Sequence, residues 1–133
     1  ILADIDHFRL VNDTHGHLVG DSVLNEFATI LRRMTRDTDT SGRWGGEEFL
    51  VICPKVDLND AFALAERIRA AVAKHSFTVV GKKTCSFGIA SYRPGDTADT
   101  MVKRADDALY KAKQHGRDRV AIESRALTCN AHA

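Results

Sequence analysis

Four carboxylates stand in two short groups that could together perform chemistry. Asp4 and Asp6 end an apolar run at the start of the chain, and Glu47 and Glu48 follow two glycines. An Asp at the end of a buried strand is costly unless it is paired or bound to a ligand. We therefore expect a functional role for at least one of Asp4 and Asp6. Paired acids at a hairpin tip suit a metal or phosphate site, and the alternative is a surface hairpin with solvated glutamates.

The two groups predict a metal site if their strands are neighbours. The Asp4 and Glu47 carboxylates would then meet at one edge of the sheet, where a backbone carbonyl adds a third oxygen. Hard oxygen ligands suit Mg²⁺, which completes its shell with water and substrate phosphates. The pattern therefore predicts a nucleoside triphosphate and phosphoryl transfer.

Two further features fit a phosphate ligand. The turn after Asp6 offers backbone N–H groups at a helix start, which suits an anion. Lys113 and Arg117 lie four residues apart around the end of the last helix, where they could clamp distant phosphates. The alternative for these two cations is simple complementarity to the helix dipole.

The elements that must position these residues alternate between strands and helices. Within the expected strand 47–53, residues 49–53 are apolar on both alternating faces, which predicts helices on both sides of the sheet. A turn at Gly45-Gly46, with positive φ at both, should join 47–53 to its partner arm. At Gly88 we expect a bulge or a close backbone approach. We expect strands over 1–6, 38–44, 47–53, 84–92 and 119–122, a helical turn over 8–14, and helices over 21–35, 57–75 and from 97 or 99 to 115. This order predicts an α+β (mixed α/β) fold with a mainly antiparallel sheet.

Composition and charge exclude several classes of protein. The chain has 133 residues, which suggests one domain. Its net charge of +1 argues against a non-specific nucleic-acid binder. No apolar run reaches the length of a membrane span, so we expect no membrane contact. The scattered cysteines 53, 85 and 129 favour a reducing, cytoplasmic location, although the full-length protein could be anchored through another region. The start without Met, within a strand pattern, predicts a fragment whose domain spans 1–123, followed by a weakly ordered tail over 124–133.

Several runs in register match one family. They are Asp4-Ile5-Asp6-His7-Phe8, Asn12-Asp13, Gly16-His17, Gly20-Asp21, Gly45-Gly46-Glu47-Glu48-Phe49, Ser86-Phe87-Gly88-Ile89-Ala90, Ala105-Asp106-Asp107-Ala108-Leu109-Tyr110 and the segment from Lys113 to Arg117. The sequence resembles the GGDEF domain of diguanylate cyclases, in a GGEEF variant. The resemblance covers residues 1 to about 123. It implies a palm-like five-stranded sheet wrapped by helices, and an enzyme that condenses two GTP into cyclic di-GMP with release of pyrophosphate. Each of two subunits brings one GTP, so a homodimer is implied.

The resemblance also implies the catalytic residues. Asp4, the Ile5 carbonyl and Glu47 should hold the metal, with Glu48 as a further ligand. Mg²⁺ or Mn²⁺ is expected, two ions per GTP. Glu47 or Glu48 should assist deprotonation of the attacking ribose 3′-hydroxyl. Arg9 stands where the family usually has a lysine proposed to stabilise the transition state. An arginine fork and an ammonium are not interchangeable, so we expect activity with an altered rate.

Substrate recognition follows from the same match. Asn12 and Asp21 correspond to residues that hydrogen-bond guanine. An Asp that accepts from the guanine N1–H and amine excludes adenine, which lacks this donor pair. The other implied GTP contacts are the backbone of His7, Phe8 and Arg9, the glycines Gly45 and Gly46, and the cations Lys113 and Arg117.

A second ligand site is implied before the glycines. Arg36 and Asp39 match the RxxD inhibitory motif through which the product binds back, and Arg67 matches the basic residue that completes that site from a neighbouring subunit. An Arg fork can grip phosphate and guanine. The alternative is an ordinary salt-bridged turn.

The main functional hypothesis is thus an active, product-inhibited cyclase with a sensor domain upstream. The alternatives are a catalytically silent cyclic di-GMP receptor and a GTP-binding regulatory module. A pure receptor has no chemical need for both Asp4 and Glu47, which favours the enzyme.

Overall fold

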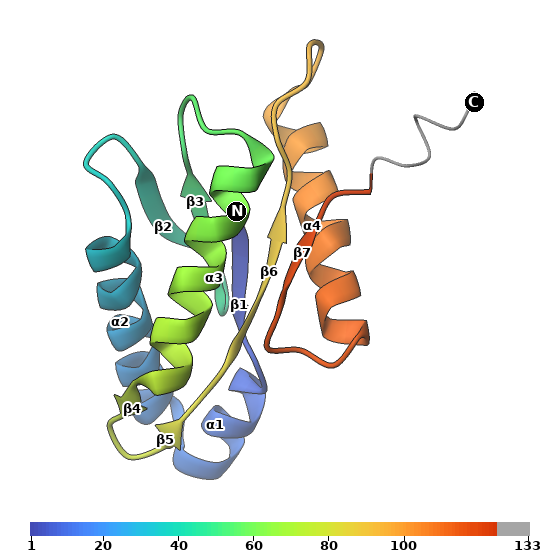
Figure 1. Cartoon of the computed structure of the whole chain (residues 1–133). Helices are drawn as coiled ribbons and strands as arrows, with labels where there is room; N and C mark the ends of the chain where they lie inside the picture. The colour runs from blue at the N-terminus through green and yellow to red at the C-terminus, as the bar shows by residue number, and fades with distance from the viewer. Residues whose placement is uncertain (125–133) are drawn as a thin grey trace.

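A five-stranded sheet forms the centre of the computed structural model, which describes residues 1–124 (Figure 1). The strand order is β2-β3-β1-β6-β7, antiparallel throughout except for the parallel pair β6–β7. The strands are β1 (Leu2–Ile5), β2 (Thr40–Gly45), β3 (Glu48–Ile52), β6 (Cys85–Ile89) and β7 (Val120–Ile122), and a separate small hairpin pairs β4 (Ser76–Phe77) with β5 (Gly81–Lys82). The predicted α+β fold with a mainly antiparallel five-stranded sheet is confirmed.

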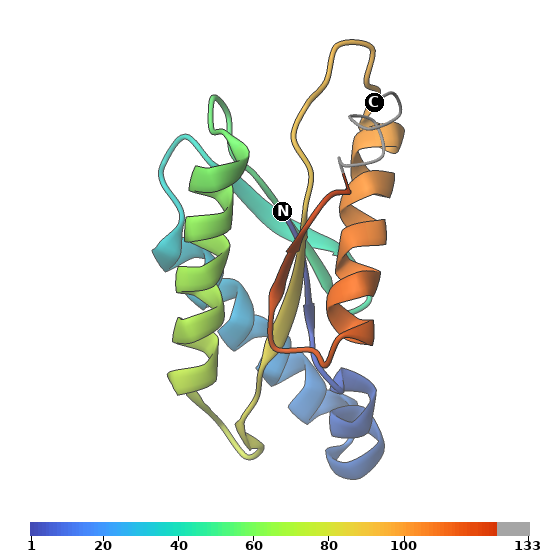
Figure 2. The ribbon, with the colours of Figure 1, turned by 45° about the vertical axis from the view of Figure 1, so that its right-hand side comes forward.

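Helices cover both faces of this sheet. Those in the described part of the chain are α1 (Phe8–His15), α2 (His17–Met34), α3 (Leu58–Lys74) and α4 (Ala98–Gln114). Figures 1 and 2 show α2 and α3 on one side of the strands and α4 on the other. The last two helices start where a side chain caps them, because Asp57 accepts from the Asp60 N–H and Thr97 accepts from the Thr100 N–H.

Helix α2 begins four residues earlier than predicted. The predicted start at Asp21 was wrong, since α2 already begins at His17. Gly16 alone separates it from α1, with φ of 89°, a conformation that glycine adopts without strain. Neither α1 nor α2 has a side-chain N-cap, so the sequence carried no capping signal for the true boundary.

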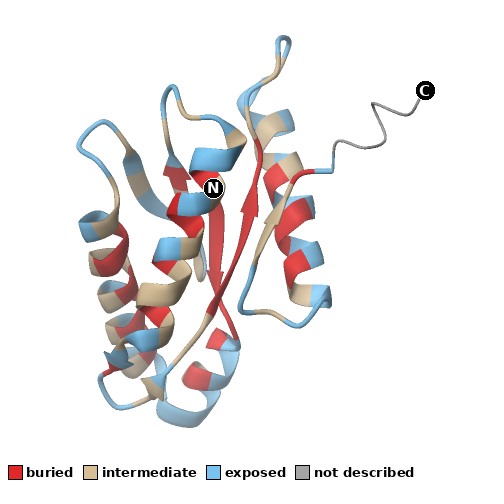
Figure 3. Cartoon of the chain, viewed as in Figure 1, coloured by how far each residue is buried: buried red, intermediate tan, exposed pale blue. Residues whose placement is uncertain are grey.

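Side-chain alternation divides the core between the two faces. Ala3 and Ile5 belong to the large cluster with residues of α2 and α3, whereas Leu2 packs with Ala105 and Leu109 of α4. Leu2 and Asp4 therefore lie on the α4 side of β1. Figure 3 shows that buried residues concentrate on β1, β6 and the inward faces of the helices. This alternation puts the first carboxylate opposite α4.

Strand β3 is covered except at its last residue. Phe49 and Val51 are buried, and Leu50 packs against the cluster on the α4 side. The side chain of Ile52, however, is 52% exposed. The predicted helices on both sides of the sheet are present, but Ile52 stays exposed because α4 packs against β1, β6 and β7 rather than against the far end of β3.

The glycine turn is shifted by one residue from its predicted position. Gly45 is the last residue of β2 and pairs with Glu48, so the turn consists of Gly46 and Glu47. Only Gly46 has positive φ, at 51°, and positive φ at both glycines was a wrong prediction. A bulge between Arg43 and Gly45 takes up the shift. The Arg43 Nε donates to the Gly46 carbonyl at 2.7 Å and so closes the tip.

Gly88 allows α4 to pack directly on the sheet. A Cβ at this position would lie 2.1 Å from the Ala105 carbonyl oxygen and 2.4 Å from the Leu109 nitrogen. These are backbone atoms of α4, which cannot move aside as a flexible side chain can. Of the two predictions for Gly88, the close backbone approach is the one confirmed.

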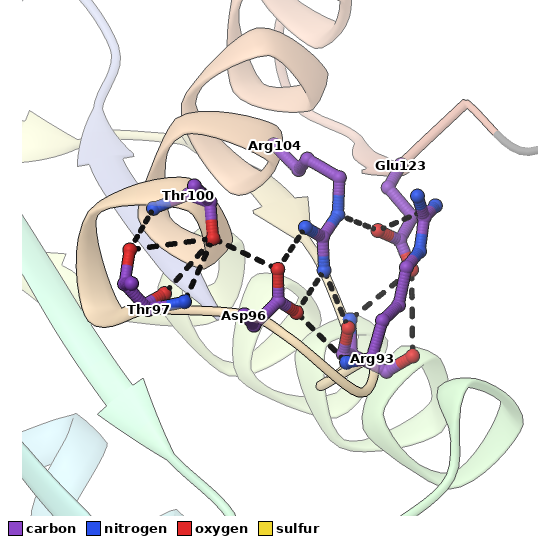
Figure 4. A network of polar contacts seen from close by, with 7 residues as sticks. Arg93, Asp96, Thr97, Thr100, Arg104 and Glu123 are labelled. Atoms are coloured by element: carbon purple, nitrogen blue, oxygen red, sulfur yellow. Dashed lines mark hydrogen bonds and ion pairs between the residues drawn. The ribbon is translucent and has the colours of Figure 1, made fainter.

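A polar network fixes the start of α4 against the end of β7 (Figure 4). Glu123 is buried, with 1% of its side chain exposed, and accepts from Arg104 Nε at 2.6 Å and Arg93 Nη2 at 3.2 Å. Arg104 also donates to both Asp96 oxygens, at 2.6 and 2.8 Å. These charge-assisted bonds hold the pKa of Asp96 well below its usual range. The network anchors the N-terminal end of the helix whose other end reaches Asp4.

The tail predicted over 124–133 lies, except for Ser124, outside the described residues. Among residues 1–124, no helix combines the length and the apolar character that crossing a membrane requires.

Candidate functional site

Strand pairing brings the two acidic groups together. β1 and β3 are neighbours, and Asp4 stands directly opposite Glu48 in their register. Directly opposed residues share a face, with Cβ atoms about 5 Å apart. Glu47 lies in the turn next to this pair. In Figure 1 the tip of the β2–β3 hairpin lies at the end of the sheet where β1 leads into α1.

Asp4 is a buried carboxylate with one oxygen engaged and the other free. Its side chain is 4% exposed, and its Oδ2 accepts a hydrogen bond from Lys113 Nζ at the end of α4. Its Oδ1 is buried and has no hydrogen-bond partner among the described residues. Burial raises the pKa of Asp4 to about 6, against the opposing effect of Lys113 and with help from Glu47 and Glu48. A buried, partly unsatisfied acid of this kind is typical of a functional site.

Glu48 is a second carboxylate whose pKa is affected by neighbouring negative charges. Burial raises its pKa above the usual value, and the charge of Asp106 on α4 adds to the effect, as does that of Glu47. Asp106 was not among the predicted site residues. Its position seven residues before Lys113, two helical turns away on the same face of α4, is the signal that could have found it.

Asp6, in contrast, is fully hydrogen-bonded. Its Oδ1 accepts from Ser86 Oγ at 2.7 Å, and its Oδ2 accepts from Thr84 Oγ1 at 2.7 Å and from the Asp118 N–H at 3.0 Å. Only 3% of the residue is exposed. Of Asp4 on β1 and Asp6 directly after it, Asp4 is therefore the one with an oxygen left unbonded by residues 1–124.

The residues expected to bind guanine lie on α1 and α2. Asn12 is half-buried on α1, and its Oδ1 has no hydrogen-bond partner among residues 1–124. Gly20, one residue before the exposed Asp21, makes room for it: a Cβ there would lie 1.9 Å from that oxygen. An unsatisfied side-chain oxygen beside an exposed carboxylate is suited to a ligand that presents several N–H donors.

The start of α1 is where the backbone contacts to phosphate are predicted. His7, the residue before the helix, adopts a left-handed conformation with φ of 57°, and Phe8 anchors the first turn in the core. Arg9 is exposed in that turn. The first N–H groups of a helix have no partner within it, and the helix dipole favours an anion there.

Lys113 and Arg117, the two cations predicted to bind phosphate, differ in their side-chain contacts. Lys113 engages Asp4, whereas the side chain of Arg117 makes no hydrogen bond or ion pair with any described residue. Arg117 follows the last turn of α4 and has φ of 62°. The two residues thus lie at the same end of α4. Of the two, only Lys113 contacts a residue that is predicted to bind the metal.

The RxxD residues form their own ion pair. Arg36 donates from its backbone N–H and from Nε and Nη2 to the Asp39 carboxylate, at 2.8 to 3.3 Å. The Arg36 side chain remains 56% exposed, and Arg67 is exposed on α3. This pair holds the pKa of Asp39 below its usual value, chiefly through the Arg36 side chain. The geometry is that of a salt-bridged turn with an accessible guanidinium.

The described side chains do not form a complete metal site by themselves. Within residues 1–124, no group of three or more His, Cys, Asp or Glu side chains is placed to hold a metal ion. Two carboxylates and a carbonyl would therefore need further ligands from water or phosphate.

A cleft of about 200 Å³ lies between α2 and β2, with Leu24, Arg43 and Phe49 among its lining residues. The carboxylates of the candidate site do not line this cleft.

Comparison with known proteins gives a consistent result. Residues 1–119 match the family model described as "Diguanylate cyclase, GGDEF domain". Diguanylate cyclase A of Treponema denticola is 45% identical over 96% of this chain, and the response regulator PleD of Caulobacter vibrioides is 47% identical over 90%. The chain spans 35% and 28% of the lengths of these two relatives.

Solved structures agree with the sequence match. The active GGEEF domain of a diguanylate cyclase from Vibrio cholerae has a TM-score of 0.86 and 38% identity, covering 93% of this chain and 81% of that one. The GGDEF domain of DgcB from Caulobacter crescentus, in complex with c-di-GMP, also has a TM-score of 0.86, with 35% identity and coverage of 91% and 74%. By family model, sequence identity and fold, the chain belongs to the GGDEF domain family of diguanylate cyclases.

Proposed function

We propose that this chain is the catalytic domain of a diguanylate cyclase, which condenses two GTP into cyclic di-GMP and releases pyrophosphate. The observation that carries the proposal is the pair formed by buried Asp4 and its cross-strand neighbour Glu48, with Glu47 at the adjoining turn. Relatives that are 45% identical and named as diguanylate cyclases support it.

The donors around Asp4 fit a hard divalent cation. Its Oδ1 is buried without a partner in the described part of the chain, and carboxylate and carbonyl oxygens are the ligands that Mg²⁺ and Mn²⁺ prefer. Asp4, the Ile5 carbonyl and Glu47 would hold the ion, with Glu48 as a further ligand and two ions for each GTP. When bound, the metal would neutralise charge developing on the phosphates. Lys113 would leave Asp4 for the terminal phosphates.

Proton transfer and charge stabilisation fall to neighbouring side chains. Glu47 or Glu48 would accept the proton of the ribose 3′-hydroxyl that attacks the α-phosphate of the other GTP. The raised pKa of Glu48 suits a general base at neutral pH. Arg9, exposed in the first turn of α1, would stabilise the transition state in place of the usual lysine.

Guanine recognition would rest on Asn12 and Asp21. Asp21 can accept from both N1–H and the 2-amino group, which adenine lacks, so replacing it by Ala should reduce the preference for GTP over ATP. The backbone of His7 and Phe8 would contact the phosphates, Gly45 and Gly46 would leave room for ribose and phosphate, and Arg117 would join Lys113.

Regulation and assembly complete the proposal. Catalysis would require a homodimer, brought together by a sensor domain upstream in a longer protein. Product would bind at Arg36 and Asp39, with Arg67 supplied by a neighbouring subunit. The exposed Arg36 guanidinium supports this, because it can exchange Asp39 for a phosphate. Arg36→Ala should leave turnover intact and abolish feedback inhibition, measured as initial rates at increasing cyclic di-GMP.

The direct test is turnover by the chain fused to a dimerising helix. GTP and Mg²⁺ are added, pyrophosphate release is followed, and the nucleotides are separated. We expect cyclic di-GMP and pyrophosphate from the unmodified chain and none from Glu47→Gln. Asp107→Asn is the matched control, because Asp107 is an exposed α4 carboxylate whose one ionic partner within residues 1–124 is Lys103.

Two results would contradict the proposal. Absence of pyrophosphate from the dimerised, folded chain would reject the cyclase, and tight binding of cyclic di-GMP without turnover would favour the receptor. Equal turnover by Glu47→Gln and the control would instead show that this hairpin carries no catalytic group.

A further inference from the structure

Asp6 is a buried acid that the proposed mechanism does not use. Its two oxygens receive three hydrogen bonds, from Ser86 Oγ, Thr84 Oγ1 and the Asp118 N–H. All three donors are neutral, so the carboxylate is not explained by an ion pair. The Asp118 bond differs from the other two because Asp118 lies in the loop between α4 and β7, whereas Ser86 is on β6 and Thr84 directly precedes it.

That loop is held in an unfavourable conformation. Gly116, Arg117 and Asp118 have φ of 120°, 62° and 48° in succession. Glycine accepts positive φ, but Arg and Asp do so at a cost. Such backbone persists only where the surroundings fix it, and it clusters at functional sites.

Bonds on both sides of Arg117 fix the loop. The Arg117 N–H donates to the Ala112 carbonyl at 3.0 Å, which closes α4, and the next N–H, that of Asp118, donates to Asp6. The Asp118 side chain accepts from Arg69 of α3 at 3.0 Å. The backbone of Arg117 is thus held between α4, β1 and α3.

The Arg117 guanidinium, in contrast, is unengaged. Among residues 1–124 it has no hydrogen-bond acceptor and no carboxylate partner. It lies four residues beyond Lys113, whose ammonium is already at Asp4. A strained backbone that is firmly held, with a side chain that bonds to none of the described residues, indicates that the side chain is presented to a ligand.

We propose that Asp6 is a positioning residue: its carboxylate holds the Asp118 N–H, and so sets the loop that presents Arg117 to the terminal phosphates of the nucleotide. This inference rests on the proposed function, because it takes GTP as the ligand. It gives Asp4 and Asp6 separate roles: Asp4 would bind the metal, and Asp6 would hold the loop.

The test is a double-mutant cycle in nucleotide affinity. The probe is α,β-methylene GTP with Mn²⁺, which cannot release pyrophosphate, and binding is measured by titration calorimetry. Arg117→Ala should weaken binding about tenfold or more, as expected for a charge-assisted contact to phosphate. Asp6→Ala should weaken it about tenfold, and the double variant should bind no more weakly than Arg117→Ala alone. Asp6→Asn should restore most of the affinity, because an amide oxygen can still accept from the Asp118 N–H.

Further variants separate positioning from general destabilisation. Ser86→Ala removes another bond to Asp6 but leaves the loop bond, and should bind the probe as the unmodified chain does. If Asp6→Ala does not fold, Asp118→Ala loosens the same loop from its other side, because it disfavours the left-handed backbone and removes the bond to Arg69. It leaves the Asp6 side chain in place and should show the same dependence on Arg117.

Three outcomes would overturn the assignment. Additive effects of Asp6→Ala and Arg117→Ala would show that Asp6 acts elsewhere, and failure of Asp6→Asn to rescue would point to a metal ligand. Failure of the unmodified chain to bind the probe would reject the proposed function itself, and this assignment with it.

Discussion

Replacing Asp4 by Asn should stabilise the metal-free protein while removing its proposed activity. The buried carboxylate is ionised at neutral pH, although burial raises its pKa to about 6. Lys113 offsets part of that cost by donating to Oδ2, but no residue from 1 to 124 donates to Oδ1. An amide of the same shape removes the charge. The site thus favours function over stability.

The magnitude follows from the difference in pKa. The usual value for Asp is about 3.9, and each pH unit of difference corresponds to about 1.4 kcal/mol, so a folded-state value of about 6 costs at most roughly 3 kcal/mol. The sign depends on which state binds the proton more tightly. Here the folded state does, so the cost is fully present above pH 6, declines between pH 6 and 4, and is absent below both values. Asp4→Asn should therefore be more stable than the unmodified chain by about 2 kcal/mol at pH 8 and equal to it near pH 3.5.

Urea unfolding with EDTA and without nucleotide measures this difference at each pH. The matched control is Asp107→Asn, which removes an exposed carboxylate and should change the free energy of unfolding by less than about 0.5 kcal/mol at every pH. A stability gain independent of pH, or a loss at pH 8, would refute the reasoning. A loss would mean that the bond to Lys113 outweighs the cost of burial.

Two further substitutions test how α4 is held. Gly88→Ala should destabilise the fold by about 2 kcal/mol or more, because its Cβ would lie 2.1 Å from the Ala105 carbonyl oxygen, and a urea midpoint unchanged from that of the unmodified chain would contradict the close packing. Arg104→Ala should destabilise it by about 3 kcal/mol, because buried Glu123 loses its 2.6 Å partner, and wild-type stability measured by thermal unfolding would show that the network contributes little.

Much of the site could be predicted from residue types and spacing. Alternation along residues 1–6 is enough to place Asp4 on the opposite face from Ala3 and Ile5, because side chains on a strand alternate whatever surrounds it. The Gly88 close approach was predicted as one of two outcomes for a glycine within a strand. Motifs in register also predicted the family, which the comparisons confirm.

Other features depended on residues far along the chain. Asp4 and Asp6 look alike in the sequence, and they differ because Asp6 meets donors 78, 80 and 112 positions later, which leave it no free oxygen. The turn at Gly46-Glu47 rather than Gly45-Gly46 depends on a bulge in the pairing of two strands. Asp106 joins the acids only because α4 packs on the sheet.

The sequence by itself thus determined the periodic elements, the family and the acids that could act. Local periodicity and backbone preference depend on neighbouring residues, so they can be recognised along the chain. The tertiary structure alone decided which acid keeps an oxygen for a ligand and which one holds a loop. A buried carboxylate takes its role from its hydrogen-bond partners, and here those partners come from segments that only folding brings to β1.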